Sequence, residues 1–201
     1  MESRVSAVER KKADKRRRLL DAALRLFAER GFHGTAVPLV AKEAGVSPGS
    51  VYRFFESKEA LVNAVFQQSK RALGAALADV DLSRPSKATF DELWARLLRF
   101  AREQPTAFHF LELQDHAPYL DEDSKSLELT VLAPIAAACS ELQRSGELDD
   151  RVSVEVVLAF VWGAFVGLFK AERHGYLTLD DSQVAQARDA CFHAFKRQET
   201  P

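Results

Sequence analysis

The chain has 201 residues, of which 47% are hydrophobic and 28% are charged. These proportions are ordinary for a globular protein of one or two domains and exclude an intrinsically disordered chain. The formal net charge of −1 conceals an uneven distribution. Residues 1–58 carry 13 Lys and Arg against 7 Asp and Glu, whereas residues 59–201 carry 15 against 22. This asymmetry predicts an anionic partner for the N-terminal part alone.

Two further features narrow the class of protein. The longest apolar run, Val156 to Phe169, is 14 residues long. A membrane span needs about 18 or more apolar residues, so the run predicts a buried helix and no membrane association. The N-terminus lacks the apolar stretch of a signal peptide. The two cysteines, Cys139 and Cys191, form no disulfide framework or metal-binding CxxC pair, and we expect both in the core of a cytoplasmic protein without a cofactor.

The first predicted element is an amphipathic helix. Its apolar residues follow the i, i+3, i+4, i+7 spacing: Leu20, Ala23, Leu24 and Phe27. We expect this helix to begin in the basic run after Arg10 and to end at Gly31, and residues 1–9 to form a flexible tail.

Two short helices are predicted next, over residues 36–44 and 48–55. Thr35 is expected to cap the first of them, and Gly45 to end it. Ser47 is expected to cap the second, which begins with a proline at its first position. A turn of three or four residues containing glycine between short helices is typical of a helix-turn-helix.

The rest of the chain predicts further helices and no convincing strand. Ser57 is expected to cap a long fourth helix over 58–80, and the segment 81–86 to be a linker. Five helical stretches follow, over 87–104, 105–118, 123–145, 151–174 and 181–197. Pro134 is expected to kink or split the third of these. The predicted architecture is all-α, with about nine helices: a small N-terminal cluster joined by the long fourth helix to a larger bundle.

Helical spacing sorts residues 48–55 into two faces. Val51, Phe54 and Phe55 should point inward. The outward residues suit contacts with DNA: Gly49, Ser50, Tyr52 and Arg53. Arginine can bond guanine edges, serine and tyrosine can bond phosphates or bases, and glycine permits close approach of the backbone. Lys58, in the first turn of the next helix, is placed to meet a phosphate.

Each of these features alone has a plainer interpretation. Short helix connections occur in many helical proteins, and an exposed Tyr-Arg pair is ordinary surface. The basic run over 10–18 also suits a solvated helix face or a flexible arm. Their coincidence within the first 58 residues favours binding of double-stranded DNA.

Residues 19–61, LLDAALRLFAERGFHGTAVPLVAKEAGVSPGSVYRFFESKEAL, resemble the DNA-binding domain of the TetR family of bacterial transcriptional regulators. The resemblance implies a DNA-binding domain over 10–58 and a ligand-binding and dimerisation domain over 59–201. By position, it implies phosphate contacts from Thr35, Ser47, Tyr52 and Lys58. It implies that Gly49, Ser50 and Arg53 face bases. Pro38 departs from the polar residue more usual at its position.

The C-terminal helices predict a dimer. The stretch 151–174 is apolar nearly all round, so it should be buried on several sides, and Gly163 and Gly167 permit close approach of another helix. One stripe runs along the last helix: Val184, Ala187, Cys191, Ala194 and Phe195. The resemblance implies that 151–174 and 181–197 form a homodimer interface, the alternative being the core of a monomer.

Residues suited to a ligand pocket lie in the central helices. Trp94, Phe108 and Trp162 supply aromatic bulk. His109, Glu112 and His116 stand at i, i+3 and i+7 of the predicted 105–118 helix. They suit a polar pocket wall, a solvated face or a divalent metal site. Of these three, we do not expect the metal site.

The sequence therefore predicts a ligand-responsive transcriptional regulator. The resemblance implies a repressor that binds a palindromic operator as a dimer and is released by a small apolar effector. No nucleophile–base pair, phosphate-binding loop or carboxylate dyad is recognisable, so we assign no catalytic residue and expect no enzyme. The alternatives are a helical enzyme and a protein-binding adaptor without DNA binding.

Overall fold

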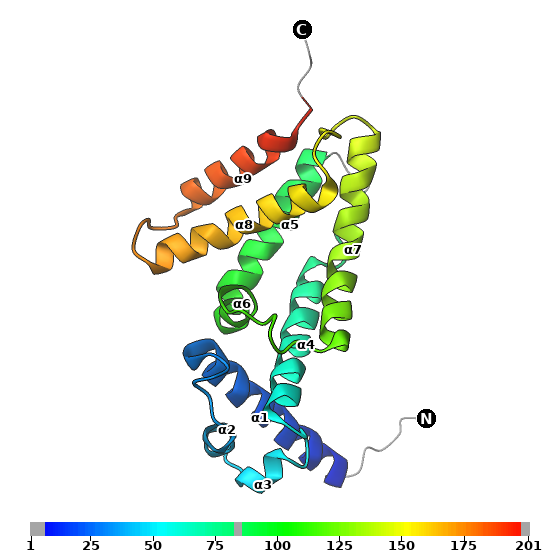
Figure 1. Cartoon of the computed structure of the whole chain (residues 1–201). Helices are drawn as coiled ribbons and strands as arrows, with labels where there is room; N and C mark the ends of the chain where they lie inside the picture. Colours follow the sequence, from blue (N-terminus) through cyan, green and yellow to red (C-terminus); the bar gives the residue numbers. More distant parts are fainter. Residues whose placement is uncertain (1–6, 83–85, 198–201) are drawn as a thin grey trace. The chain divides into compact units, whose positions relative to one another are not determined.

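The computed structural model describes residues 7–82 and 86–197, and these residues form nine helices and no β-strand (Figure 1). The N-terminal helices are α1 (Ala7–Arg30), α2 (Val37–Glu43), α3 (Pro48–Val51) and α4 (Lys58–Leu77). The others are α5 (Ser86–Glu103), α6 (Pro105–Leu113), α7 (Glu122–Arg144), α8 (Val154–Arg173) and α9 (Asp181–Phe195). The predicted all-α architecture is confirmed.

The helices form two compact units that interleave along the sequence. The first unit combines Met1–Ala72 with Glu103–Leu127, and the second combines Leu73–Arg102 with Glu128–Pro201. The long helices α4 and α7 therefore each contribute to both units. Helix α6 belongs to the same unit as α1, α2 and α3, although it lies more than forty residues downstream of them.

The core of the first unit lies where α1 meets α2 and α6. The predicted stripe of α1 is buried, with Phe27 only 1% exposed. The Phe27 ring lies 6.3 Å from that of Phe110 on α6. Burying a phenylalanine side chain contributes about 1.5–3 kcal/mol, so such contacts supply much of the free energy that holds α6 against α1.

The ends of the first helices are set by local backbone chemistry. Gly31 and Gly45 have φ of +68° and +66°, a conformation that favours glycine, and they end α1 and α2 as predicted. The Ser57 side chain accepts a hydrogen bond from the Ala60 N–H at 3.0 Å, which confirms the predicted cap of α4. Thr35 does not cap α2: Ala36 is the cap residue, and no side chain caps that helix.

In the second unit, α5, α8 and α9 meet through ion pairs and rings. Lys87 on α5 contacts both Asp91 and Asp189, and the guanidinium of Arg188 lies 3.1 Å from Asp91. Trp94 on α5 makes an edge contact with Phe165 on α8. The two cysteines are buried and free, as predicted, and burial raises the pKa of both thiols.

Several predicted boundaries differ from the structure. Helix α1 already begins at Ala7, whereas residues 1–6 of the predicted tail and 83–85 of the predicted linker lie outside the described residues. Helix α3 ends at Val51 instead of residue 55, and α4 ends at Leu77 instead of residue 80. Helix α7 continues through Pro134, so the predicted split is wrong, and the alternative, a kink at Pro134, stays a prediction. Pro134 is exposed, so its ring lies on the solvent side of α7.

Helix α6 ends five residues before its predicted end, at Leu113. The residue before a proline avoids the helical conformation, and Pro118 therefore disfavours helix at Ala117, while Gln114 is already extended. The Asp115 side chain also accepts a hydrogen bond from the Ala117 N–H at 3.1 Å, which stabilises a turn there. The segment 114–121 consequently leaves the helix axis and carries His116 with it.

Candidate DNA-binding surface and ligand-binding residues

The turn between α2 and α3 holds α3 against the core of the first unit. The Val46 N–H donates to the Ala41 carbonyl at 2.9 Å, closing the turn beyond Gly45. Val51 and Phe55 are buried, at 1% and 5% exposure, and confirm the predicted inward face. Phe54, predicted to share that face, is half-buried.

The opposite side of α3 presents polar groups to solvent. Ser47, Gly49 and Arg53 are exposed, and Tyr52 is 56% exposed. Ser50 is half-buried, and its hydroxyl lies 2.9 Å from that of Ser47. No atom outside the neighbouring backbone lies within 4 Å of where a Cβ on Gly49 would stand, so a phosphate or base edge could approach the backbone closely there.

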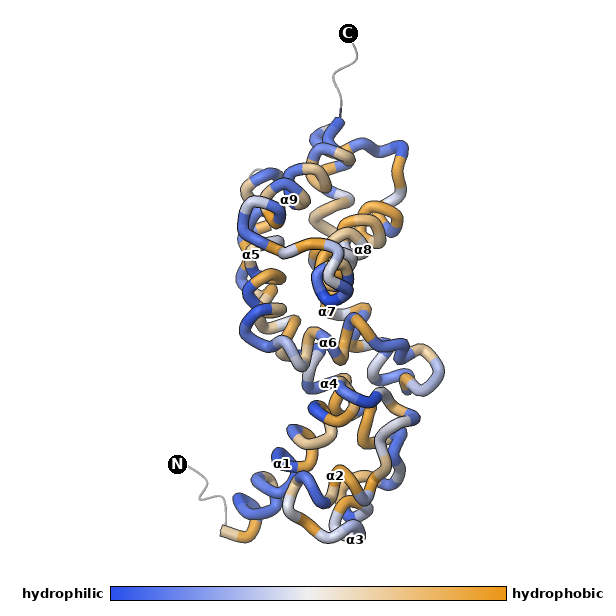
Figure 2. The backbone as a smooth tube through the Cα atoms, turned by 90° about the vertical axis from the view of Figure 1, so that its left-hand side faces the viewer, coloured by the Kyte–Doolittle hydropathy of each residue, from blue (hydrophilic) through white to orange (hydrophobic). Residues whose placement is uncertain are grey.

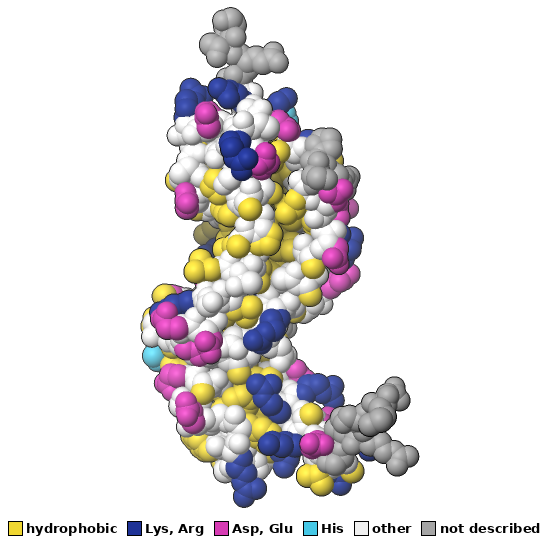
Figure 3. All heavy atoms as spheres, turned by 90° about the vertical axis from the view of Figure 1, so that its right-hand side faces the viewer, with side chains coloured by type: hydrophobic (Ala, Val, Ile, Leu, Met, Phe, Trp, Pro, Cys, Tyr) yellow, Lys and Arg dark blue, Asp and Glu magenta, His cyan; other side chains and the backbone are white. Residues whose placement is uncertain are grey.

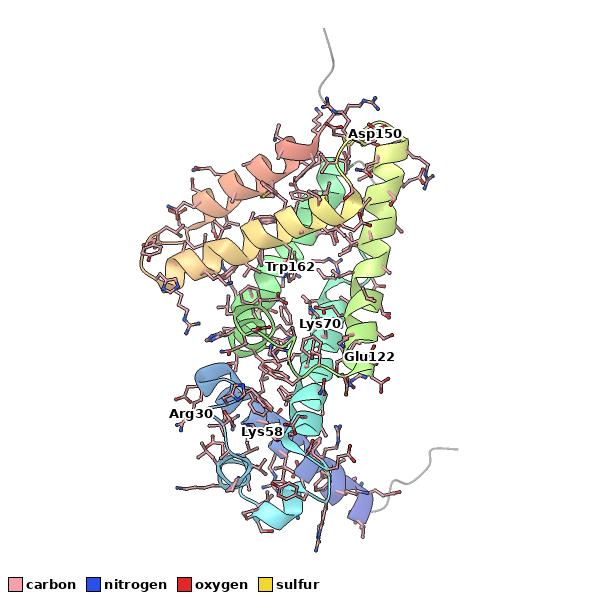
Figure 4. All side chains as sticks on the ribbon, in the orientation of Figure 1. Arg30, Lys58, Lys70, Glu122, Asp150 and Trp162 are labelled. Carbon is pink, nitrogen blue, oxygen red and sulfur yellow. The ribbon has the colours of Figure 1, made fainter. Side chains whose placement is uncertain are left out.

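Lys58 is the first residue of α4 and lies near the polar surface around α3 (Figure 4). Its side chain is half-buried, and its Nζ lies 4.1 Å from the centroid of the Phe32 ring. The ammonium is thus held over an aromatic face, a geometry that stabilises a cation by about 0.5–1 kcal/mol at exposed sites.

Thr35 is placed differently from the expectation. Thr35 is 1% exposed, and its hydroxyl shares its one proton between the carbonyl oxygens of Leu26 and Gly31, at 3.1 and 2.9 Å. Because the hydroxyl is enclosed, it is not available to a phosphate in this structure. Thr35 instead ties the segment after α1 to the end of that helix.

Helix α1 begins at Ala7, so the basic run over 10–18 is helical and does not form a flexible arm. Two cations of this run make contacts within the first unit. The Arg16 guanidinium lies 5.4 Å from the centroid of the Phe55 ring, and Arg18 donates to the Ala44 carbonyl at 3.3 Å. Other cations of the run are exposed: Arg10, Lys11 and Lys12. Figure 3 shows Lys and Arg side chains gathered on the surface of the N-terminal helices.

The six residues predicted to line a ligand pocket divide between the two units. Trp94 and Trp162 lie in the second unit, where both rings contact Phe165, at 5.2 and 6.3 Å between centroids. Trp94 is 2% exposed, and its Nε1–H has no hydrogen-bond acceptor among the described residues.

The other four pocket residues lie in the first unit: Phe108, His109, Glu112 and His116. The predicted common face of the last three is wrong, because α6 ends at Leu113 and His116 lies beyond it. Glu112 instead meets Lys70 of α4, with 3.6 Å between Oε1 and Nζ and both side chains under 10% exposed. Within the described residues, no group of three or more His, Cys, Asp or Glu could hold a metal ion.

His116 is the centre of a buried cluster. It is 5% exposed and packs against Phe66 and Phe110. Its Nε2 hydrogen-bonds the Phe110 carbonyl, so that nitrogen carries the proton and Nδ1 accepts from the Tyr119 hydroxyl at 2.7 Å. Burial raises the pKa of the Tyr119 phenol from 10.0 to about 12, so this donor is even further from losing its proton at neutral pH than an exposed tyrosine.

A polar stripe on α4 was not predicted. Asn63, Gln67 and Lys70 stand at i, i+4 and i+7 and all meet the part of the first unit that contains α6 and the start of α7. Asn63 donates to the Tyr119 carbonyl at 2.8 Å, and Gln67 donates to the Ser124 hydroxyl at 3.2 Å. The helical spacing of these three polar residues, inside an otherwise apolar helix face, was a signal available in the sequence.

Helix α8 carries an apolar surface that its own chain leaves open. It buries only Val157, Phe165 and Val166, whereas Val156 and Phe160 are each 54% exposed. The expectation of burial on several sides is therefore not met within one chain. By length and composition alone, with a mean hydropathy of 1.8, α8 could cross a membrane, and only 17% of that stretch is buried. Figure 2 shows its predominantly hydrophobic colouring.

Comparisons with known proteins cover most of the chain. Residues 19–65 match the model of bacterial regulatory proteins of the tetR family, and residues 66–197 match that of the tetracyclin repressor-like C-terminal domain. The transcriptional regulator UidR of Escherichia coli K12 is 44% identical over 59 residues, 29% of this chain and 30% of UidR. The repressor KstR2 of Rhodococcus jostii is 45% identical over 56 residues, 28% of each chain. The chain thus matches less than a third of the length of these relatives.

Solved structures show the same fold. A TetR family transcription regulator from Marinobacter aquaeolei has a TM-score of 0.81 at 24% identity, covering 94% of this chain and 99% of that one. A TetR-family regulator from Haemophilus influenzae has a TM-score of 0.75 at 20% identity, covering 92% and 98%. Since the two family models together run from residue 19 to residue 197, the chain belongs to the TetR family of bacterial transcriptional regulators.

Proposed function

We propose that this protein is a cytoplasmic, ligand-responsive repressor that binds a palindromic DNA operator as a homodimer and is released by a small effector. The observation that carries the proposal is the exposed polar face around α3, beside a lysine at the start of α4. A short helix held on the core by one apolar face, with arginine and tyrosine on the other, has the form of a major-groove reader.

The residues of this face divide by role. Lys58, Tyr52 and Ser47 contact phosphates, which fix the position of the protein on the duplex. Arg53 reads a base edge, with Gly49 and Ser50 close to the bases. Thr35 is left out of the contact set because its hydroxyl is enclosed.

The dimer forms through the open surface of α8, together with α9. A Cβ at Gly163 or Gly167 would meet no atom of the chain within 4 Å, so a partner helix has room to approach both positions. With Phe160 beside them, they give α8 an apolar contact surface that a second copy would cover. Dimerisation sets two recognition helices about 34–36 Å apart, which matches two half-sites one helical turn apart.

The effector binds among the aromatic residues of the C-terminal region. The ring cluster of Trp94, Trp162 and Phe165 suits an apolar body. The buried Trp94 Nε1–H favours an effector that also carries a hydrogen-bond acceptor, because a buried donor without an acceptor costs free energy. To lower operator affinity tenfold, the effector must favour the released state by about 1.4 kcal/mol.

The test is binding to duplex DNA from the region flanking the protein's own gene, measured at several salt concentrations. Lys58→Ala is expected to weaken binding to every bound sequence and to lower the slope of log affinity against log salt by about 0.9, because one phosphate contact is lost. Arg53→Ala is expected to change base preference at one position, by about 1–3 kcal/mol.

Arg144→Ala is the matched control, because Arg144 is an exposed arginine of the second unit paired with Glu141. It should leave affinity, slope and base preference unchanged. An unaltered slope in Lys58→Ala would contradict the phosphate contact, and failure of the wild type to bind any flanking duplex would contradict the proposed function.

A further inference from the structure

We infer that Phe32 and Tyr119 position the Lys58 ammonium for its phosphate contact, so that a residue between α6 and α7 acts on DNA affinity through Lys58. The inference rests on the proposed role of Lys58. It assigns a DNA-binding role to a ring that lies more than fifty residues beyond the helix-turn-helix and touches no DNA itself.

The Phe32 ring is shared between the two residues. The Tyr119 ring stacks on it, with 4.4 Å between centroids and 22° between planes. The Lys58 Nζ lies over the same ring, 4.1 Å from the centroid. A stacked ring at that distance leaves no room for an ammonium on the same face, so Phe32 is enclosed between Tyr119 and Lys58.

The position of Phe32 depends on its neighbours because it lies just after the end of α1, at Gly31. Its contact with Phe27 is looser, at 6.2 Å between centroids. Tyr119 therefore provides the closer aromatic contact. A lysine side chain has four rotatable bonds, so the orientation of its ammonium depends on what it rests against. Removing the Tyr119 ring frees Phe32 to tilt, and the Lys58 ammonium loses its fixed direction.

Tyr119 is itself held from two helices. Its hydroxyl donates to His116, which is bonded to the Phe110 carbonyl of α6. Its backbone carbonyl accepts from Asn63 of α4, and the Asn63 side chain also accepts from the Asp121 N–H at 3.0 Å. The ring is thus fixed relative to the same helix that Lys58 begins. This shared support makes Tyr119 a positioning residue and not only a member of the core.

The experiment is a double-mutant cycle on operator affinity, with the full-length protein and the same flanking duplex. Tyr119→Leu is expected to weaken binding about fivefold and to lower the salt slope in the direction of Lys58→Ala. In the Lys58→Ala background it should have no further effect, because the group through which it acts is gone. Tyr119→Phe keeps the stacked ring and should retain most of the affinity.

Tyr176→Leu is the matched control, because Tyr176 is 82% exposed in the second unit and should not affect binding. A structural role for Tyr119 would weaken binding equally in both backgrounds and leave the slope unchanged, which overturns the inference. Phe32→Leu supplies a second variant, with the same non-additivity expected, if Tyr119→Leu does not fold.

A measurement without DNA separates this inference from the proposed function. Protons held over an aromatic face resonate upfield, so the Lys58 Hε signals should be shifted in the wild type and in Tyr119→Phe. They should return to ordinary lysine values in Tyr119→Leu and Phe32→Leu. If the wild type binds no duplex, the proposed function fails and this signal alone decides whether the ring pair positions Lys58. An unchanged signal in Tyr119→Leu would overturn the positioning role whatever the DNA result.

Discussion

The Thr35 hydroxyl is enclosed at the end of α1, where it shares one proton between two carbonyl oxygens. Thr35→Val removes that hydroxyl at nearly constant volume. It is expected to lower the free energy of unfolding by about 1–3 kcal/mol, because the buried carbonyls of Leu26 and Gly31 lose this donor. Urea unfolding followed by circular dichroism measures the change.

Thr35→Ser is the control, because it keeps the hydroxyl and should retain most of the stability lost in Thr35→Val. Neither variant should change the salt slope of DNA binding. A lowered slope in Thr35→Val with undiminished stability would instead restore a phosphate contact to this side chain.

Several residues whose role depends on near neighbours could be predicted from the sequence, although Ser47, predicted to cap α3, makes no capping hydrogen bond with its side chain. Gly31 and Gly45 adopt the positive φ that ends a helix, and Ser57 caps α4, because each needs only the backbone beside it. Thr35 could equally have capped α2 or bonded upstream carbonyls. The choice depends on how the segment after α1 folds back on that helix, and sequence spacing does not contain this.

At the scale of elements, the helices were predictable and their ends less so. Amphipathic spacing identifies α1 and α5, whereas the end of α6 depends on the competition between Pro118 and the preceding residues. That boundary also made part of the predicted site wrong. His116 was predicted on a helix face with His109 and Glu112, but the earlier end of α6 places it against Tyr119. The sequence does not indicate that Tyr119 is connected to Lys58 through the Phe32 ring.

The contact between α5 and α9 makes a prediction about acid stability. Hydrogen bonds from Arg188 and Lys87 lower the pKa of Asp189 from its usual 3.8 to about 2. A carboxyl group with a lowered pKa in the fold contributes stability above pH 3.8, and this contribution is lost as the pH falls toward 2. The wild type should therefore lose its advantage in melting temperature over Asp189→Asn between pH 5 and pH 2.

Thermal unfolding of both proteins across that range checks the prediction. Asp149, whose pKa is also lowered to about 2 by hydrogen bonds from Arg151, remains in both proteins and affects them alike. A difference in melting temperature that stays constant from pH 5 to pH 2 would mean that Asp189 contributes nothing through its charge.

At the scale of the whole molecule, the near-zero net charge is a cancellation. The excess of Lys and Arg in residues 1–58 lies on the part that would face phosphates, and the acidic excess lies in the rest of the chain. This distribution was readable from the sequence. The grouping of α6 with α1, α2 and α3 was not, because it depends on contacts such as that between Phe27 and Phe110 across more than eighty residues.

At the scale of the whole molecule, the exposed apolar surface of α8 predicts a dimer. Phe160→Glu places a carboxylate in the middle of the proposed contact between two copies. It is expected to weaken dimerisation at least tenfold, because a charge would have to lose its water without a partner. Sedimentation equilibrium of the DNA-free protein measures the change. Binding to a palindromic duplex should weaken as well, since separate monomers lose the benefit of linked half-site contacts.

Leu129→Glu is the matched control, because Leu129 is 69% exposed on α7, outside the proposed interface. It should leave both dimerisation and operator binding intact. Equal weakening of the dimer by both substitutions would indicate a general effect of added negative charge, and a dimer unaffected by Phe160→Glu would place the interface on another surface. Only a loss specific to Phe160→Glu fits a second copy seated on α8, which would explain why a helix this apolar buries so little of itself within one chain.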